Sequence, residues 1–170
     1  MTHWPIRVGN ILVTSQYVTK LFHVPFHYIL YLIEEDVAFG AFQSKLDLAI
    51  QLIEEAVISE SPFSCVAADS WYFCDKIIKY LASIGKEWVF ASKSNRKICV
   101  KGLWMPLRKF AHTLTQKDFK EVKIIRTNRK VLSVCAFSKT VRMSKVGRVK
   151  IVISYLDEPF KGDPFFLVTN

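Results

Sequence analysis

Residues 64–96 read SCVAADSWYFCDKIIKYLASIGKEWVFASKSNR, and this stretch decides the fold. A short apolar run ends on Asp69, a helical pattern follows, and a second apolar run leads into a basic loop over 93–96. The order strand, helix, strand predicts a right-handed βαβ unit with two parallel strands. Ligands of open α/β sheets bind beyond the carboxyl ends of the strands. We therefore expect Asp69 and the basic loop to lie side by side at the functional edge of a sheet.

Periodic segments extend this unit on its N-terminal side. β-rich runs over 11–17 and 27–33, joined by a linker over 20–25, predict an antiparallel pair of strands. Apolar residues recur at helical spacing over 44–59, which predicts an amphipathic helix that Ser44 caps. The expected apolar stripe of this helix contains Leu46, Ala49, Ile50, Ile53, Ala56 and Val57.

The C-terminal half of the chain shows a different pattern. The helix of the central unit is expected over 75–84, with Gly85 in a left-handed conformation behind it. After Arg96 the pattern changes to short strand candidates separated by turn signals. These candidates are 98–100, 122–125, 130–137, 149–155 and 165–169. We interpret the chain as an α/β core over 1–96 and a β-rich segment over 97–170, whose last strand returns to the core.

Length and composition limit the class of protein. The chain has 170 residues, enough for one domain with its own core, and about half of them are hydrophobic. No apolar run approaches the roughly 18 residues of a membrane-spanning helix. The four cysteines are isolated, without a Cys-x-x-Cys pair, which predicts reduced thiols in a cytosolic protein rather than a zinc site or a disulfide framework.

The net charge of +9 is distributed unevenly along the chain. Residues 1–92 carry six Lys or Arg against ten Asp or Glu, whereas residues 93–150 carry seventeen against two. A basic segment attached to a mildly acidic core favours a polyanion as partner, and nucleic acid in particular. The alternative is a solvated, lysine-rich surface without a ligand.

Short motifs of the central stretch resemble a known enzyme family. The sequence ADSWY over 68–72, followed by a helix, GK over 85–86, an apolar strand and KSNR over 93–96, is similar to the region around the second catalytic aspartate of IS4-type DDE transposases. The Asp-x-x-Tyr spacing from Asp69 to Tyr72 matches the family pattern, and a weaker resemblance extends over almost the whole chain. It implies an RNase H-like mixed sheet with flanking helices, followed by a β-rich insertion.

The resemblance also implies a metal-dependent site. DDE enzymes cut and join DNA with two divalent ions, Mg²⁺ or Mn²⁺, which carboxylates hold together. Asp69 is the implied catalytic metal ligand, and Tyr72 is a supporting residue of its motif. The family uses two further acids, but residues 1–33 contain none and the Tyr-x-x-Arg-x-x-x-Glu signature of the last helix is absent. We therefore expect a truncated, internal piece of such a core, without the first strand and the last helix, with an unpaired strand edge.

Each candidate residue also has a purely structural interpretation. An aspartate at a strand end often caps a turn, here through Ser70 or Trp71. The loop over 93–96 is either a solvated basic turn or a phosphate contact. Four aromatic side chains either stack on bases or, as is more common beside apolar strands, pack in the core or at its rim. They are Trp71, Tyr72, Trp88 and Trp104.

Candidate DNA contacts come from the basic part of the chain. They are Lys93, Asn95, Arg96, Arg126, Arg129, Lys130, Arg142 and Arg148. Contacts to phosphates give an affinity that falls with salt and depends little on sequence. Successive side chains of a strand point to opposite faces, so about half of the basic side chains can meet DNA.

Taken with the family resemblance, these features predict a DNA transposase segment that binds transposon ends. Such a protein is expected in the cytoplasm of a prokaryote, associated with the nucleoid and not with membranes. The alternative is a non-catalytic DNA-binding or regulatory fragment that associates with itself or with full-length transposase. A third interpretation is a non-functional remnant that folds poorly. The first two predict DNA binding, and only the first predicts chemistry.

Overall fold

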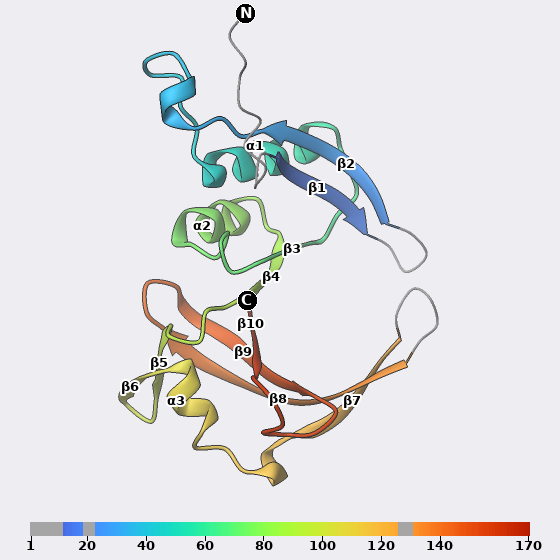
Figure 1. Cartoon of the computed structure of the whole chain (residues 1–170), viewed down its shortest axis with the longest axis vertical. Helices are drawn as coiled ribbons and strands as arrows, with labels where there is room; N and C mark the ends of the chain where they lie inside the picture. The colour runs from blue at the N-terminus through green and yellow to red at the C-terminus, as the bar shows by residue number, and fades with distance from the viewer. Residues whose placement is uncertain (1–11, 19–22, 126–130) are drawn as a thin grey trace, which may run out of the picture. The chain divides into compact units, whose positions relative to one another are not determined.

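The chain divides into two compact units, Met1–Phe63 and Ser64–Asn170 (Figure 1). The predicted boundary after Arg96 lies inside the second unit. The computed structural model describes residues 12–18, 23–125 and 131–170. The chain contains both helices and strands, with a mixed sheet in its second unit, in agreement with the predicted α/β class.

The first unit consists of a β-hairpin and a helix. β1 (Leu12–Val18) and β2 (His23–Leu30) pair antiparallel, which confirms the predicted pair of strands. The 3-10 helix η1 (Glu34–Asp36) leads to α1 (Lys45–Ile58), the predicted amphipathic helix. The linker predicted over 20–25 is too long, because the second strand already begins at His23.

This hairpin contains a bulge and makes a polar side-chain contact with α1. The register of the two strands shifts by one residue after Ser15, where the next pairing is to Pro25. Proline has no backbone N–H to donate to the ladder, so in strands it is confined to places such as this irregularity, where the regular pairing is interrupted. His27 on β2 places its Nδ1 2.8 Å from Oε2 of Glu55 on α1. The strand and the helix are thus joined by a polar contact in addition to apolar packing.

The start of α1 agrees with the sequence prediction, whereas its buried side differs. Ser44 and Asp47 form a capping box, in which Asp47 N donates to Ser44 Oγ at 3.3 Å and Ser44 N donates to Asp47 Oδ2 at 3.0 Å. The most deeply buried residues are Leu48 and Leu52, and Val57 of the predicted stripe is 39% exposed. The predicted stripe is wrong because α1 carries apolar residues on two sides, and their spacing alone does not tell which side is buried.

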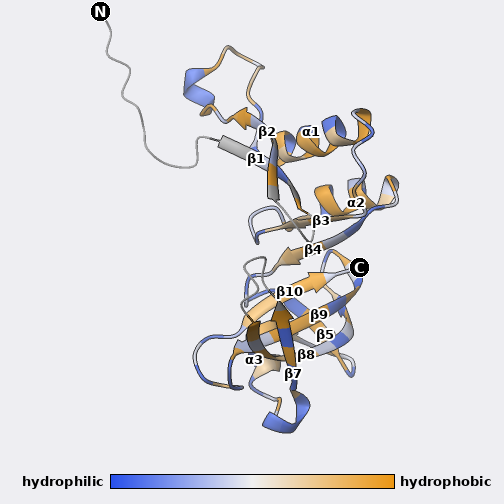
Figure 2. Ribbon diagram, turned by 90° about the vertical axis from the view of Figure 1, so that its right-hand side faces the viewer, coloured by the Kyte–Doolittle hydropathy of each residue, from blue (hydrophilic) through white to orange (hydrophobic). Residues whose placement is uncertain are grey.

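An eight-stranded mixed sheet forms the centre of the second unit (Figures 1 and 2). Seven strands are hydrogen-bonded in the order β3-β4-β10-β9-β8-β5-β6, and the eighth strand, β7, also pairs with β8. The strands are β3 (Cys65–Ala68), β4 (Glu87–Ala91), β5 (Lys97–Val100), β6 (Leu103–Pro106), β7 (Lys120–Ile125), β8 (Val131–Met143), β9 (Gly147–Leu156) and β10 (Phe165–Thr169). β3 and β4 are parallel, which confirms that prediction, and all other pairs are antiparallel. Among the described strands, β3 pairs with β4 alone.

The helix between β3 and β4 also lies where the sequence predicted it. α2 spans Asp75–Ser83, and Gly85 behind it has a φ of +66°, a conformation that favours glycine. α2 buries Ile77 and Leu81 at i and i+4, the spacing of one helix face. This βαβ arrangement fixes where Asp69 and the loop after β4 lie.

The β-rich part contains elements that the sequence patterns missed. Three were not predicted: β6, the short helix α3 (Leu107–Ala111) and the 3-10 helix η2 (Gln116–Asp118). The strand predicted over 130–137 is longer in the structure, since β8 runs to Met143. The predicted turn at 127–128 falls outside the described residues.

The two faces of the large sheet differ in how far their side chains are buried. One face carries the core of the unit, to which α2 and α3 also contribute; its fully buried members include Phe90, Ile98, Ile151, Ile153 and Val168. The other face carries Thr140, Arg142, Arg148 and Lys150, all exposed, and half-buried residues such as Val152 and Leu167. β9 and β10 show largely hydrophobic colours, which reflects the core-facing side chains (Figure 2). The second face is therefore an open surface with a basic part.

Candidate functional site

Asp69 directly follows β3, at the carboxyl end of a strand that runs parallel to β4. Its side chain is exposed, and its Oδ1 accepts a hydrogen bond from Trp71 N at 2.7 Å. Tyr72 N donates to the Asp69 carbonyl at 3.3 Å and closes the turn. The turn-capping interpretation is therefore correct for one carboxylate oxygen. The other oxygen has no hydrogen-bond partner among the described residues and is available to a ligand.

The loop after β4 contacts the loop after β3 through two cations and two rings. Lys93 Nζ lies 5.0 Å from the centre of the Trp71 ring. The Arg96 guanidinium lies 5.0 Å from the centre of the Phe73 ring, and its Nη2 donates to the Phe73 carbonyl at 2.6 Å. The acidic turn and the basic loop thus occupy neighbouring positions at one sheet edge, as expected from the parallel strands.

These contacts give the predicted DNA-binding residues different roles in the folded chain. Arg96 is half-buried and holds the two loops together. Lys93 is exposed over Trp71, and no ion pair joins it to Asp69. Asn95 is exposed and makes no hydrogen bond with the described part of the chain. Lys93 and Asn95 are therefore open to a ligand, whereas Arg96 is already engaged by the protein.

A further support of the basic loop was not recognised in the sequence. Leu107 N at the start of α3 donates to the Arg96 carbonyl, and Arg108 N donates to the Ser94 carbonyl, both at 2.9 Å. The buried residues of α3 are Leu107, Phe110 and Ala111, at i, i+3 and i+4. This spacing is the one available signal for α3, and it covers little more than one turn.

The aromatic candidates divide between core and surface. Trp88 is 3% exposed and packs against Phe73 and Phe90, with ring centres 6.0 and 5.5 Å apart. Core packing is therefore confirmed for Trp88. For Trp71 it is wrong, since this side chain is 73% exposed, and Trp104 is half exposed as well.

Among residues 12–18, 23–125 and 131–170, no three His, Cys, Asp or Glu side chains gather in a group that fits a metal ion. At the sheet edge, Asp69 offers one carboxylate oxygen that no described residue engages. Mg²⁺ in proteins uses one or two carboxylates together with waters and substrate phosphates. Asp69 thus fits one position of a metal site and does not complete one within the described chain. The four cysteines are free thiols.

Tyr72 lies in the same turn as Asp69, and its phenol is affected by the Asp69 charge. Burial, and secondly the negative charge of Asp69, raise the pKa of Tyr72 above its ordinary value of 10.0. The folded chain therefore keeps this proton to a higher pH than the unfolded chain does. The associated stability is present below about pH 10 and is lost as the pH rises through the raised pKa.

We expect Asp69→Asn to lower the pKa of Tyr72 toward its ordinary value, because the neutral amide removes the negative charge. Titration of the Tyr72 ring carbon resonances by NMR measures this change. Tyr155 is the matched control, since its pKa is raised by burial and by Asp163 and not by Asp69. An unchanged Tyr72 titration would show that the carboxylate does not act on the phenol.

The predicted DNA contacts outside the loop lie in β8 and β9 or outside the described residues. Arg142 and Arg148 are exposed and stand directly opposite each other on the two strands. Arg126, Arg129 and Lys130 are outside the described residues. Further exposed basic residues on β7, β8 and β9 are Lys120, Lys123, Lys139 and Lys150.

No helix in the described part of the chain is long and apolar enough to cross a membrane. Comparison of the sequence with known proteins finds no matching family model, and no curated protein matches it significantly. The functional conclusion therefore depends on the residues and their geometry.

Proposed function

We propose that this chain is a segment of an IS4-type DDE transposase, with an RNase H-like core, and that it acts in DNA transposition. Asp69 is the position that holds Mg²⁺ or Mn²⁺, Tyr72 supports it, and Lys93 and Asn95 meet the DNA backbone. The carrying observation is an exposed aspartate, with one unengaged oxygen, at the carboxyl end of a strand parallel to its neighbour. Ligand sites of open α/β sheets occupy this place.

Two other features support the proposal. The basic loop contacts the Asp69 turn, so phosphate and metal can meet at one edge. β3 pairs with a described strand on one side only, and in a complete core of this family a further strand with its own acid would pair with the other side, beside Asp69. The 170-residue chain by itself supplies one of the three acids that the family uses, so we expect it to be catalytically incomplete.

Metal binding at Asp69 can be tested with Mn²⁺ as a paramagnetic probe. We expect millimolar Mn²⁺ to broaden the amide resonances of residues 69–72 selectively, because one carboxylate binds weakly. Asp69→Asn should abolish the broadening, whereas Asp163→Asn, a control at another exposed aspartate, should leave it intact. Broadening that is equal in wild type and Asp69→Asn would contradict a metal site at this residue.

A cleavage assay on supercoiled DNA tests the catalytic part of the proposal. We expect little or no Mg²⁺- or Mn²⁺-dependent cleavage by the isolated chain, since no three His, Cys, Asp or Glu side chains gather into a metal-binding group in its described part. DNA turnover that Asp69→Ala abolishes would show a complete site and refute the incomplete one. The proposed association is tested by mixing this chain with a full-length transposase and measuring whether the binding of transposon ends changes.

The second candidate function is a non-catalytic DNA-binding or regulatory fragment. It is favoured by the exposed basic residues on β8 and β9, far along the chain from Asp69. Binding to DNA that is unaffected by Asp69→Asn and by divalent ions would support this function over the transposase segment. For either function we expect the protein to act on DNA in the cytoplasm of a prokaryote.

A further inference from the structure

Two arginines face each other across the β8–β9 ladder. Arg142 and Arg148 are paired in register, and the next rung on the same face pairs Thr140 with Lys150. Residues directly opposite each other in an antiparallel pair point to the same face, about 5 Å apart, and like charges at such positions destabilise the pair. All four side chains are exposed on the open face of the sheet. The fold therefore holds three positive charges together at a cost in stability.

Nothing in the described part of the chain neutralises these charges. The side chains of Arg142, Arg148 and Lys150 make no hydrogen bond or ion pair with described residues. Their neighbours on the adjoining strands are Cys99, in register with Arg142, and Thr169, in register with Lys150. Neither neighbour is an acid. An anion from outside the chain is the partner that this arrangement lacks.

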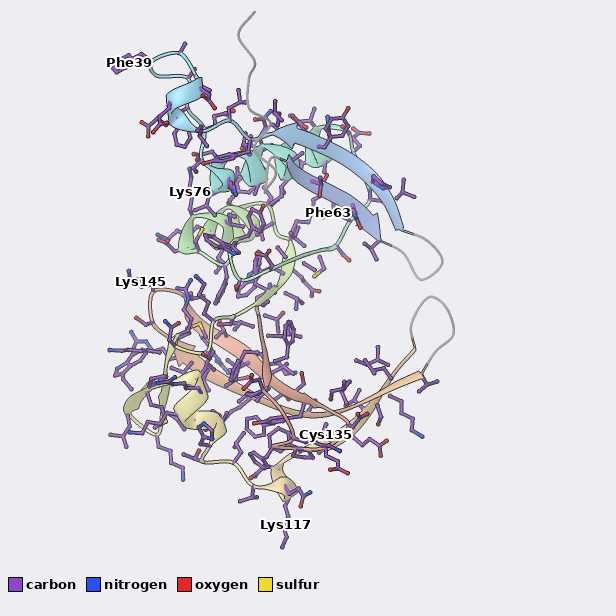
Figure 3. All side chains as sticks on the ribbon, viewed as in Figure 1. Phe39, Phe63, Lys76, Lys117, Cys135 and Lys145 are labelled. Carbon is purple, nitrogen blue, oxygen red and sulfur yellow. The ribbon has the colours of Figure 1, made fainter. Side chains whose placement is uncertain are left out.

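The arginine pair also borders an open hollow. It has a volume of about 510 Å³ and is lined by Cys99, Thr140, Val141, Arg142 and Arg148. Guanidinium groups bind phosphate oxygens through two parallel N–H donors, and a threonine hydroxyl adds a second kind of donor. The hollow is shallow and solvent-facing, so it suits a group attached to a larger molecule. Lys145 in the β8–β9 turn adds a further cation at the end of this hairpin (Figure 3).

We propose that Arg142, Arg148, Thr140 and Lys150 form a phosphate-binding site that takes the sugar-phosphate backbone of a nucleic acid. The two rungs are two residues apart along each strand, about 7 Å, so one stretch of backbone can contact both. The identity of the nucleic acid as DNA rests on the proposed function, whereas the phosphate chemistry does not. The site is independent of Asp69 and needs no metal.

The double variant Arg142→Gln/Arg148→Gln tests the site against a matched control. Lys109→Gln/Lys117→Gln removes the same charge from exposed positions on α3 and η2, and Lys117 points outward at a distance from the Lys145 turn (Figure 3). By fluorescence anisotropy with duplex and single-stranded oligonucleotides, we expect the arginine variant to lose tenfold or more in affinity at low salt. The slope of log affinity against log salt should fall by about 2, one for each lost phosphate contact. The lysine control should change affinity by less than about threefold.

Cys99 provides a second measurement that does not need DNA. We expect inorganic pyrophosphate to slow alkylation of Cys99 in the wild type, measured by peptide mass spectrometry, and to have no effect in the arginine variant. Thermal unfolding checks that this variant folds, and we expect an equal or higher melting temperature because like-charge repulsion is removed.

The outcomes separate the site from the function. Pyrophosphate protection without DNA binding would support the phosphate site and overturn DNA as its ligand. Equal DNA binding by the wild type and the arginine variant would overturn the site and leave the proposed function standing. Displacement of DNA by polyglutamate as effectively as by pyrophosphate of equal ionic strength would overturn a phosphate site in favour of an acidic protein partner.

Discussion

Replacing Phe90 with alanine is expected to lower the free energy of unfolding of the second unit by about 3–5 kcal/mol. Phe90 is 0% exposed and lies in β4, between β3 and β10. Its ring stacks on Phe73 at 5.9 Å and packs against Trp88 at 5.5 Å. Truncation leaves a cavity beside the two remaining rings that rigid neighbouring strands cannot close, so the transfer and cavity contributions add.

Denaturant unfolding followed by tryptophan fluorescence measures this loss, because Trp88 reports on the same cluster. Phe165→Ala is the matched control: it removes the same side chain from β10, where Phe165 is 56% exposed, and should cost less than about 1 kcal/mol. If both variants lose the same stability, the aromatic cluster is not the centre of the core. The cluster also supports the candidate site, because Phe73 follows the Asp69 turn and its carbonyl accepts a hydrogen bond from Arg96.

The central βαβ unit was predictable because several local signals agree. An apolar run, an amphipathic helix and a second apolar run follow each other within 64–92, and Gly85 meets the left-handed position behind α2. Parallel strands joined by a helix place both carboxyl ends at the same edge. The nearness of the Asp69 turn and the basic loop follows from this topology, without any knowledge of side-chain packing.

The rest of the second unit depends on contacts that no local pattern encodes. α3 is short, and it exists because its apolar side meets the sheet and its first amides bind the basic loop. β8 continues past Phe137 because β9 pairs with it along its length, through the exposed segment 138–140. The open face is a property of the whole sheet, since it arises where no described helix covers the residues that alternate with the core.

The role of Arg96 shows the same limit at the candidate site. Its sequence context suggested a phosphate contact, and the structure places its guanidinium on the Phe73 ring and carbonyl. Composition and motif spacing identify a cation near the site, but they do not tell whether another group of the protein already binds that cation. Lys93 and Asn95, three residues or fewer away, remain exposed.

Arg96→Ala is expected to lower the free energy of unfolding by about 1.5–3 kcal/mol, the usual range for a hydrogen bond from a charged donor. The variant leaves the Phe73 carbonyl without this donor and removes the cation from the ring. Arg96→Lys should recover less than half of the loss, because an ammonium group lacks the planar guanidinium that contacts carbonyl and ring together. Denaturant unfolding of the second unit measures both variants.

Lys93→Ala provides the comparison within the same loop. Its ammonium group lies over Trp71 at an exposed position, where such a contact contributes about 0.5–1 kcal/mol or less. The two variants should therefore differ in the property that they change. We expect Arg96→Ala to affect stability and Lys93→Ala to affect the salt dependence of DNA binding. An Arg96→Ala variant that keeps full stability and loses DNA affinity would instead identify Arg96 as a phosphate contact. In that case the guanidinium must leave Phe73 when DNA binds, and the two loops would be joined by the ligand rather than by the protein.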